Sequence, residues 1–482
     1  MRLIFSLILA FSLNATATAA PEPQIHYALT DELAPVLELP LFAQSRVGIQ
    51  VIDIETGEEV FAHNSDEEYI PASVMKVLTA AIAYRTLGPD YRFRTDIYTD
   101  GRIENGVLNG NLYIKGTGDP TLVSEKLWKV IHDLKTNGIT EIKGQIIYDD
   151  SHFDGASLIP GWTKEADLES GPAYFPPLSA LSINFNTVAL MVRPGDRIGD
   201  DAIVNLEYPM PFIEIEADVK TIAPGSKPWM VIERTIEEDQ IRFSISGKIN
   251  HGEVNPWIYY RTIPQPELLF QGLFRQLAKE QGITIRGRDR MGTVPNNVVL
   301  LTTLYSQPLR ELTADMNKHS RNLIAEHLIR AVGYEYSGVA TTEAGLDVLH
   351  DYLVDLGVPE SDFDIKNGSG LSPDTKIKPS VITAVLLDLY RDPSIRHEFL
   401  ASLAVNGQEG TLKWRLKDEP QHGKLRGKTG SINGVYCLGG YIRTNSGQIY
   451  AFSFLVNDIH RSVRSVREAQ DIFASIIMQT NP

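Results

Sequence analysis

Cysteine is almost absent from this sequence of 482 residues, which contains only Cys437. A single thiol cannot form an internal disulfide, so the fold must depend on a hydrophobic core and not on covalent cross-links. The sequence also has no run of 18 apolar residues, and we therefore predict no transmembrane segment. At roughly 100–200 residues per domain, the length is sufficient for two to four domains.

Positive charge is scarce as well. The chain has 45 lysines and arginines against 61 acidic residues, which gives a formal net charge of -16. No run of basic residues is long enough to form a strong local patch. Because such a protein repels polyanions over most of its surface, we expect no nucleic-acid partner.

The first twenty residues have the pattern of a secretory signal peptide. Arg2 precedes an apolar stretch over residues 3–13, and alanines follow at alternate positions up to Ala19. This stretch is too short to cross a bilayer stably. We predict that residues 1–20 are a signal peptide and that the mature protein is periplasmic, either soluble or peripherally associated with the membrane.

The rest of the chain alternates between two kinds of pattern. Hairpin patterns occur over residues 46–64 and 436–458, and a helical pattern follows each of them. From about residue 92 to residue 302, short alternating runs predominate and only two helices are convincing; after residue 305 the pattern becomes helical again. An antiparallel sheet made from both ends of the chain and covered by helices accounts for this order.

Ser73-Val74-Met75-Lys76 is the only Ser-x-x-Lys sequence in the chain. Residues three apart on a helix share a face, so the Lys76 amine can reach the Ser73 hydroxyl. A serine hydroxyl becomes an effective nucleophile when a nearby base takes its proton, and a lysine can be that base once its pKa is lowered. Taken alone, the motif would more often be a serine at a helix start followed by a solvated lysine.

Lys428-Thr429-Gly430 is also unique in the chain. It leads into a strand pattern whose edge could bind an extended peptide and offer a cation and a hydroxyl group to a carboxylate. The sequence from Gly423 resembles a P-loop, but only three residues separate it from Gly427 where a P-loop has four, so we reject a nucleotide site. A turn before a strand is equally compatible with the motif alone.

Ser-x-Asn is a weak motif, because it occurs four times, starting at Ser12, Ser182, Ser320 and Ser431. We interpret the segment around Ser182 as an ordinary half-buried strand. Ser320 and Asn322 lie between two helical patterns, in a turn that can project side chains into a cleft. We therefore select Ser320 and Asn322 as the candidate site residues.

In this order, Ser-x-x-Lys, Ser-x-Asn and Lys-Thr-Gly resemble the motif set of penicillin-binding proteins and class A β-lactamases. The sequence contains neither a Gly-x-Ser-x-Gly elbow nor a His-Glu-x-x-His metal motif. Further segments and the long separation between Ser73 and Ser320 make the chain similar to class C low-molecular-mass penicillin-binding proteins, the D-alanyl-D-alanine carboxypeptidase/endopeptidase family (peptidase family S13). These segments are residues 118–122, 150–154, 316–326, 368–372 and 410–412.

The resemblance implies an α/β (α+β) fold with a β-lactamase/transpeptidase-like catalytic domain. Its antiparallel sheet would be covered by helices, and a large β-rich insertion would split it. We expect the catalytic domain to comprise residues 21–91 and 303–482, and the insertion residues 92–302. Within the insertion we expect two subdomains, about 92–190 with 260–302, and about 191–259.

The resemblance also implies a serine D-Ala-D-Ala carboxypeptidase and/or DD-endopeptidase that acts on peptidoglycan muropeptides and is acylated by β-lactam antibiotics. The catalytic residues implied are Ser73, Lys76, Ser320, Asn322 and Lys428. The substrate-binding residues implied are Thr429, Gly430 and Ser431, with Asp167 as a candidate partner for a substrate amine. No cofactor or metal is implied, and no oligomeric state is predicted. A serine β-lactamase and a non-catalytic peptidoglycan-binding scaffold are the alternative functions.

Overall fold

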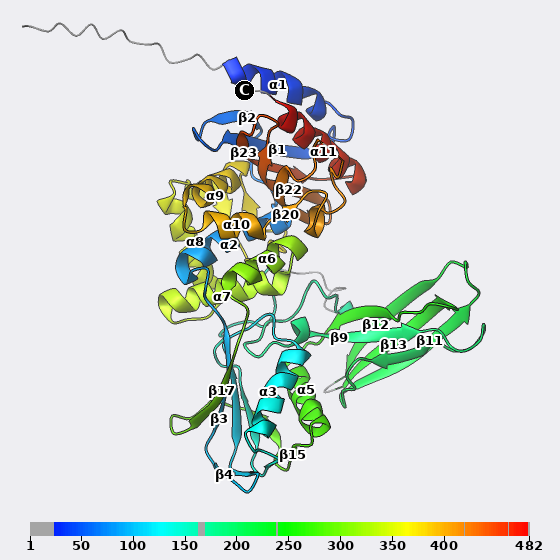
Figure 1. Cartoon of the computed structure of the whole chain (residues 1–482). Coiled ribbons are helices and arrows are strands. Elements are labelled where there is room, and N and C mark those ends of the chain that lie inside the picture. Colours follow the sequence, from blue (N-terminus) through cyan, green and yellow to red (C-terminus); the bar gives the residue numbers. More distant parts are fainter. Residues whose placement is uncertain (1–23, 162–168, 238–239, 419, 461, 481–482) are drawn as a thin grey trace, which may run out of the picture.

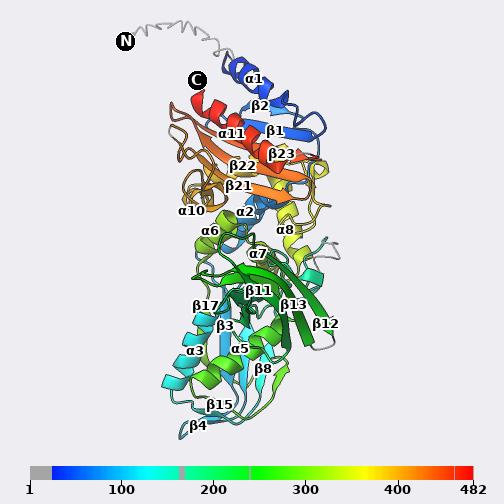
Figure 2. The same ribbon diagram turned by 90° about the vertical axis from the view of Figure 1, so that its right-hand side faces the viewer.

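The computed structural model describes residues 24–161, 169–237, 240–418, 420–460 and 462–480. The predicted signal peptide and Asp167 lie outside the described residues. Two views show an upper part built from both ends of the chain and a lower part formed by its middle (Figures 1 and 2). Within the described ranges, no helix has the length and apolar character needed to cross a membrane.

An antiparallel six-stranded sheet joins the two ends of the chain. Its strands lie in the order β2 (Glu59–His63), β1 (Arg46–Asp53), β23 (Ile449–Asn457), β22 (Val435–Arg443), β21 (Leu425–Ile432) and β20 (Ala404–Val405). Strand β1 pairs with β23 along its whole length, from Arg46 opposite Asn457 to Asp53 opposite Tyr450. The prediction that the first and last hairpins share one sheet is confirmed.

Helices cover both faces of this sheet. They are α1 (Gln24–Leu37) and α11 (Val463–Gln479) on one face, and α2 (Lys76–Leu87) and α9 (Pro379–Arg391) on the other (Figure 1). Successive side chains of a strand point to opposite faces. In β23, Phe452 and Phe454 therefore pack with α11, whereas Ala451 and Leu455 pack with α2 and α9. Because both faces are buried, this central strand is apolar almost throughout.

Four further helices complete the upper part. They are α6 (Leu309–His319), α7 (Asn322–Ser337), α8 (Thr342–Asp355) and α10 (Arg396–Ser402). Buried residues of α6, α7 and α8 share one hydrophobic cluster with α2 and α9. The cluster fixes the start of α7, and therefore the Ser-x-Asn turn, relative to the start of α2.

The lower part combines several sheets with helices that include α3 (Ser124–Thr136) and α5 (Pro266–Glu280). One sheet has the order β16 (Asp289–Met291), β8 (Ile146–Asp149), β6 (Leu112–Gly116), β3 (Arg94–Thr99) and β17 (Val299–Tyr305). A second has the order β15 (Thr284–Ile285), β7 (Glu141–Ile142), β5 (Val107–Asn109) and β4 (Arg102–Glu104). Strands β3 and β17 pair with each other, so the chain enters and leaves the lower part side by side (Figure 1).

Two three-stranded sheets extend the lower part. One has the order β10 (Ile203–Leu206), β9 (Thr187–Arg193) and β14 (Trp257–Thr262). The other has the order β11 (Ile213–Ile222), β13 (Gln240–Asn250) and β12 (Trp229–Glu237), and it projects to one side in Figure 1. The β-rich insertion that splits the upper part is thus present, as the fold prediction required.

The segment after Ser182 is not the strand that its alternating sequence suggested. Strand β9 begins only at Thr187, and Asn184, Phe185 and Asn186 have positive φ angles of 48°, 56° and 54°. Asparagine tolerates this left-handed conformation better than most residues. The buried Asn186 side chain donates a hydrogen bond to Ser182 Oγ at 2.9 Å, which stabilises a turn where a strand ladder was expected.

We expect Phe473→Ala to lower the free energy of unfolding by about 3–5 kcal/mol, because it leaves a cavity between α11 and the six-stranded sheet. Phe473 is 1% exposed, and its ring lies 5.0 Å from that of Phe454 and 6.1 Å from that of Phe452, between centroids. Urea unfolding measures the change. The matched control is Ile472→Ala, whose side chain is 48% exposed; equal losses in the two variants would contradict this packing.

Candidate active site

Ser73 lies in a 3-10 turn, Ala72–Met75, and Lys76 is the first residue of α2. The 3-10 turn continues directly into α2, so the two residues lie on one helical segment, as the Ser-x-x-Lys spacing suggested, with a first turn that is 3-10 and not α. In a 3-10 turn, side chains three residues apart eclipse each other, and Lys76 Nζ donates a hydrogen bond to Ser73 Oγ at 2.9 Å. Ala72 has a φ of 46°, a left-handed conformation that costs a non-glycine residue about 1–3 kcal/mol. The strain is located directly before the candidate nucleophile.

The Lys76 amine is completely buried among oxygen acceptors. Besides Ser73, it donates to Asn322 Oδ1 at 2.7 Å and to the carbonyl oxygen of Ser369 at 2.6 Å. Burial lowers the pKa of Lys76 to about 7, although the nearby Glu326 carboxylate opposes the shift. A lysine with this pKa is partly neutral at physiological pH and can accept a proton from the serine.

Ser320 and Lys428 form a second serine–lysine pair. Ser320 ends α6 in the left-handed conformation, with a φ of 59°. Lys428 Nζ donates to Ser320 Oγ at 2.8 Å and to the carbonyl oxygen of Thr429 at 2.7 Å. Burial, and to a smaller extent the charge of Lys76, lower the pKa of Lys428 well below its usual range. Lys76 also binds Asn322, two residues after Ser320, and this contact brings the two pairs into one site.

The outer edge of β21 is open beside these pairs. Strand β20 pairs only with Arg426 and Gly427, so from Lys428 onward the strand has no ladder partner on that side among the described residues. Thr429 is 8% exposed and Ser431 is exposed. An open strand edge of this kind can hold an extended peptide by main-chain hydrogen bonds.

Gly430 allows β21 to approach the Ser73 turn closely. A Cβ atom at this position would lie 2.7 Å from the carbonyl oxygen of Pro71 and 3.0 Å from the amide nitrogen of Ser73. Any side chain would push the strand away from the turn. The glycine of the Lys-Thr-Gly motif therefore has a packing role that the sequence motif does not reveal.

The Ser-x-Asn turn is attached to the insertion by two contacts. Asn322 Nδ2 donates to the carbonyl oxygen of Tyr174 at 2.7 Å. The guanidinium group of Arg321 lies 4.7 Å from the centre of the Phe185 ring, a cation–π contact. The insertion thus contacts Asn322, which itself binds Lys76, and Arg321, which follows Ser320 in the chain.

Glu326 is a buried residue of the site to which sequence reasoning gave no role. Its carboxylate accepts hydrogen bonds from the amide nitrogens of Ser369 at 2.8 Å and Gly368 at 3.3 Å. Burial raises the pKa of Glu326, and these hydrogen bonds and the charge of Lys76 oppose the shift. Because Ser369 is also the carbonyl acceptor of Lys76, Glu326 positions that acceptor. In the sequence, Glu326 stands out as a charged residue in an apolar helical pattern. It lies four residues after Asn322 and therefore on the same face of that helix.

The structure brings eight of the nine predicted site residues to this region, and Asp167 is the one that lies outside the described residues. Among the residues that the structure describes, no group of three or more His, Cys, Asp or Glu side chains could hold a metal ion. The site therefore consists of two serine–lysine pairs, an asparagine and an open strand edge. A serine hydroxyl bonded to a lysine of low pKa is suited to nucleophilic attack on a carbonyl group and to acyl transfer.

The sequence matches the D-Ala-D-Ala carboxypeptidase 3 (S13) family over residues 29–477. It is 30% identical over 446 residues to a D-alanyl-D-alanine carboxypeptidase of Actinomadura sp. (strain R39), covering 90% of this chain and 81% of that protein. It is 26% identical over 416 residues to the D-alanyl-D-alanine carboxypeptidase DacB of Haemophilus influenzae, covering 86% of this chain and 85% of that protein.

Solved structures show the same fold. Penicillin binding protein 4 (dacB) from Haemophilus influenzae superimposes with a TM-score of 0.80 at 25% identity, covering 93% of this chain and 99% of that chain. The same protein has been crystallised in complex with a β-lactam. A predatory peptidoglycan endopeptidase from Bdellovibrio bacteriovorus superimposes with a TM-score of 0.51 at 17% identity, covering 90% of this chain and 92% of that chain.

We expect Glu326→Gln to destabilise the protein by about 1–3 kcal/mol, because the new amide group places an N–H donor against a backbone N–H donor. Glu326 uses different oxygens for Gly368 and Ser369, so either amide orientation loses one bond. Chemical denaturation measures the loss. Glu335→Gln, an exposed change on the same helix, is the control and should alter stability by less than about 0.5 kcal/mol; a neutral Glu326→Gln would argue against this positioning role.

Proposed function

The chain belongs to the D-Ala-D-Ala carboxypeptidase 3 (S13) family, and from this premise we propose that Ser73 is the nucleophile with which this penicillin-binding serine peptidase cleaves D-alanyl-D-alanine peptides. The observation that carries the proposal is the hydrogen bond of 2.9 Å between Ser73 Oγ and Lys76 Nζ, formed by an amine that burial brings to a pKa of about 7. A lysine in this state can take the serine proton as the hydroxyl attacks.

The first half of the reaction forms an acyl-enzyme. Ser73 Oγ attacks the carbonyl carbon of the penultimate D-alanine, and its proton passes to Lys76 Nζ. Backbone N–H groups of Ser73 and Ser431 hold the negative oxygen of the tetrahedral intermediate. The C–N bond then breaks, and the leaving amine takes up a proton from Ser320 Oγ, which the Lys428 amine in turn resupplies. The 2.8 Å bond between Lys428 and Ser320 supports this relay.

The second half of the reaction is hydrolysis. Before this step Lys76 loses to solvent the proton that it took from Ser73, and Lys428 regains one. A water molecule then attacks the ester at Ser73 and Lys76 accepts a proton from the water. That proton passes to Ser73 Oγ as the C–O bond breaks, and the peptide leaves with a new carboxyl group that ionises in solution. Thr429 binds the carboxylate of the departing D-alanine when that residue is terminal. A β-lactam acylates the same serine, but its leaving group stays tethered to the acyl chain, so the adduct persists.

The natural substrates in this proposal are peptidoglycan muropeptides. Removal of a terminal D-alanine is carboxypeptidase activity, and cleavage of a cross-link is endopeptidase activity by the same residues on a bulkier leaving group. The open edge of β21 from Lys428 onward supports both, because a main-chain ladder tolerates different side chains. The signal-peptide pattern of residues 1–20 supports a periplasmic location, where peptidoglycan is found.

We expect Ser73→Ala to abolish stable labelling by a fluorescent penicillin and the release of D-alanine from a pentapeptide muropeptide, because the variant has no hydroxyl group to acylate. Labelling is measured on a denaturing gel and D-alanine by mass spectrometry. Ser361→Ala, an exposed serine on a loop turn, is the matched control and should keep both activities. Rapid release of opened penicillin by the wild type would instead identify a β-lactamase, and folded wild type without any adduct would support a binding scaffold.

The rate of penicillin acylation should rise with pH through about 7 and level off about one unit above it, because the base is the neutral amine of Lys76. Below the pKa the amine is protonated and cannot accept the serine proton. Stopped-flow or quenched labelling between pH 5.5 and 9 measures the profile. Lys76→Arg keeps the cation but cannot lose its proton, and it should acylate at least about 100-fold more slowly. A flat profile would show that Lys76 is not the base.

A further inference from the structure

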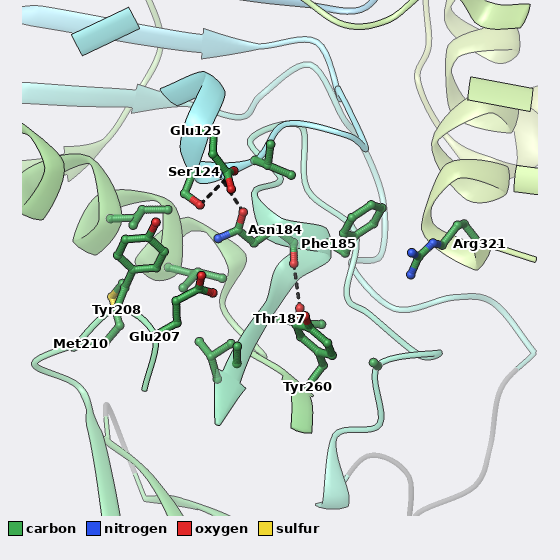
Figure 3. A pocket seen from close by; sticks show the side chains of 16 residues that line it. Ser124, Glu125, Asn184, Phe185, Thr187, Glu207, Tyr208, Met210, Tyr260 and Arg321 are labelled. Atoms are coloured by element: carbon green, nitrogen blue, oxygen red, sulfur yellow. Dashed lines mark hydrogen bonds between the residues drawn. The ribbon is translucent and has the colours of Figure 1, made fainter. Parts of the chain in front are cut away.

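Cavities lie at both ends of α7, where the upper part meets the insertion. One, of 320 Å³, lies between Arg321 at the start of the helix and the strands of the insertion (Figure 3). The other, of 600 Å³, is lined by Tyr334 and Glu335 at the end of the helix and by residues of β3. A small buried apolar cluster joins the two parts and consists of Ile159, Phe175, Leu178, Leu323 and Leu371. Because this cluster is small, we expect the hydrogen bonds beside it to contribute to docking.

Side chains of α7 donate hydrogen bonds to backbone carbonyl groups of the insertion. His327 Nδ1 donates to Gly118 at 2.8 Å, and the Arg330 guanidinium group donates to Asp154 at 3.3 Å and to Ala156. Both side chains are buried, and because they are three residues apart they share a face of the helix. Gly118 and Asp154 belong to two of the segments on which the family resemblance rests, and these segments supply acceptors that hold the insertion on α7.

Asn367 connects the insertion to the loop that holds Lys76. Its completely buried amide donates from Nδ2 to the carbonyl oxygen of Pro160 in the insertion, at 2.8 Å. Its Oδ1 accepts from the amide nitrogen of Gly370, also at 2.8 Å. Between the two bonded positions lies Ser369, whose carbonyl oxygen accepts from Lys76 at 2.6 Å. The amide of Asn367 therefore fixes the backbone on both sides of this acceptor.

Lys76 is thereby connected to the insertion by two routes. Asn322 bonds both to the amine and to a carbonyl oxygen of the insertion, and Asn367 reaches the amine through the loop at Ser369. Two of the three acceptors of the amine thus depend on contacts with the insertion. Glu326 supports the same loop from α7, so the loss of Asn367 should weaken this support without removing it.

We propose that Asn367 is a positioning residue for the acylation of Ser73, and that Arg330 acts together with it by docking the insertion on α7. Asn367 clamps the loop at Ser369 to the insertion, so that the Ser369 carbonyl group keeps the Lys76 amine directed at Ser73. Arg330 fixes the segment of the insertion that leads to the partner of Asn367. This inference rests on the proposed roles of Ser73 and Lys76, and it makes docking of the insertion a condition for their reaction.

The test measures acylation of the full chain by a fluorescent penicillin in stopped-flow experiments. At saturating penicillin, we expect Asn367→Ala to lower the first-order acylation rate constant about tenfold, because the variant loses the bonds that hold the loop at Ser369. The dissociation constant of the initial complex should stay within about twofold of wild type, since Asn367 lies away from the open edge of β21. The control is Phe473→Ala, which removes core packing next to α11 and should acylate at the wild-type rate. This control separates lost positioning from lost stability.

Arg330 provides a second, independent variant far along the helix from the reacting atoms. Arg330→Met keeps the aliphatic stem but loses the donors, and it should slow acylation about fivefold, whereas Arg330→Lys keeps a cationic donor and should recover at least about half of the wild-type rate. The double variant Asn367→Ala/Arg330→Met should be less than about twofold slower than Asn367→Ala alone, because both changes act through the same docking. Multiplicative effects, or a wild-type rate in Arg330→Met, would contradict the proposal.

The outcomes separate failure of the positioning role from failure of the proposed function. If wild-type protein acylates normally and Asn367→Ala keeps the same acylation rate constant, Asn367 is not a positioning residue. If Asn367→Ala slows acylation only by weakening the initial complex, the role assigned to it is likewise wrong. If folded wild-type protein forms no adduct at all, the roles of Ser73 and Lys76 are themselves overturned.

Discussion

The burial of two lysine amines in one site is the constraint on which the rest of the structure depends. Removing an ammonium group from water is energetically unfavourable unless oxygen acceptors surround it. Where these acceptors do not compensate fully, burial lowers the pKa of the group. Lys76 has three such acceptors, contributed by the Ser73 turn, the start of α7 and the loop at Ser369. Each comes from a different segment of the chain, so the helical block must pack correctly before the amine can be accommodated.

The positions of these acceptors depend in turn on the close approach of neighbouring backbone segments to the Ser73 turn. Gly430 lets β21 reach the Ser73 turn, and Gly370 does the same for the loop at Ser369, because a Cβ there would lie 2.0 Å from the carbonyl oxygen of Ala72. Gly370 also has a φ of 72°, which disfavours any other residue. The site is therefore built by backbone segments that touch on both sides of a strained turn, and its reactive side chains have little freedom to move apart.

The sequence was sufficient to predict the elements with strong local periodicity and the motif residues. The hairpin that begins at Arg46, helix α5 and helix α11 have repeating apolar patterns that sequence periodicity detects. The left-handed turn at Asn184–Asn186 was missed because an alternating pattern favours a strand, and only the buried amide of Asn186 reveals otherwise. Glu326 could not be given a role, since its partners lie in a loop that approaches it only after folding.

The insertion helps to orient one side chain of the active site, the amide group of Asn322. An asparagine side chain has one accepting and one donating end, and Asn322 donates from Nδ2 to the carbonyl oxygen of Tyr174 in the insertion. This bond forces Oδ1 toward Lys76, where it accepts at 2.7 Å. The reverse orientation would place an N–H donor against the Lys76 amine and the amide oxygen against a carbonyl oxygen. A backbone group of the insertion thus determines that Asn322 presents an acceptor to the base, which holds the Lys76 amine directed at both Asn322 and Ser73.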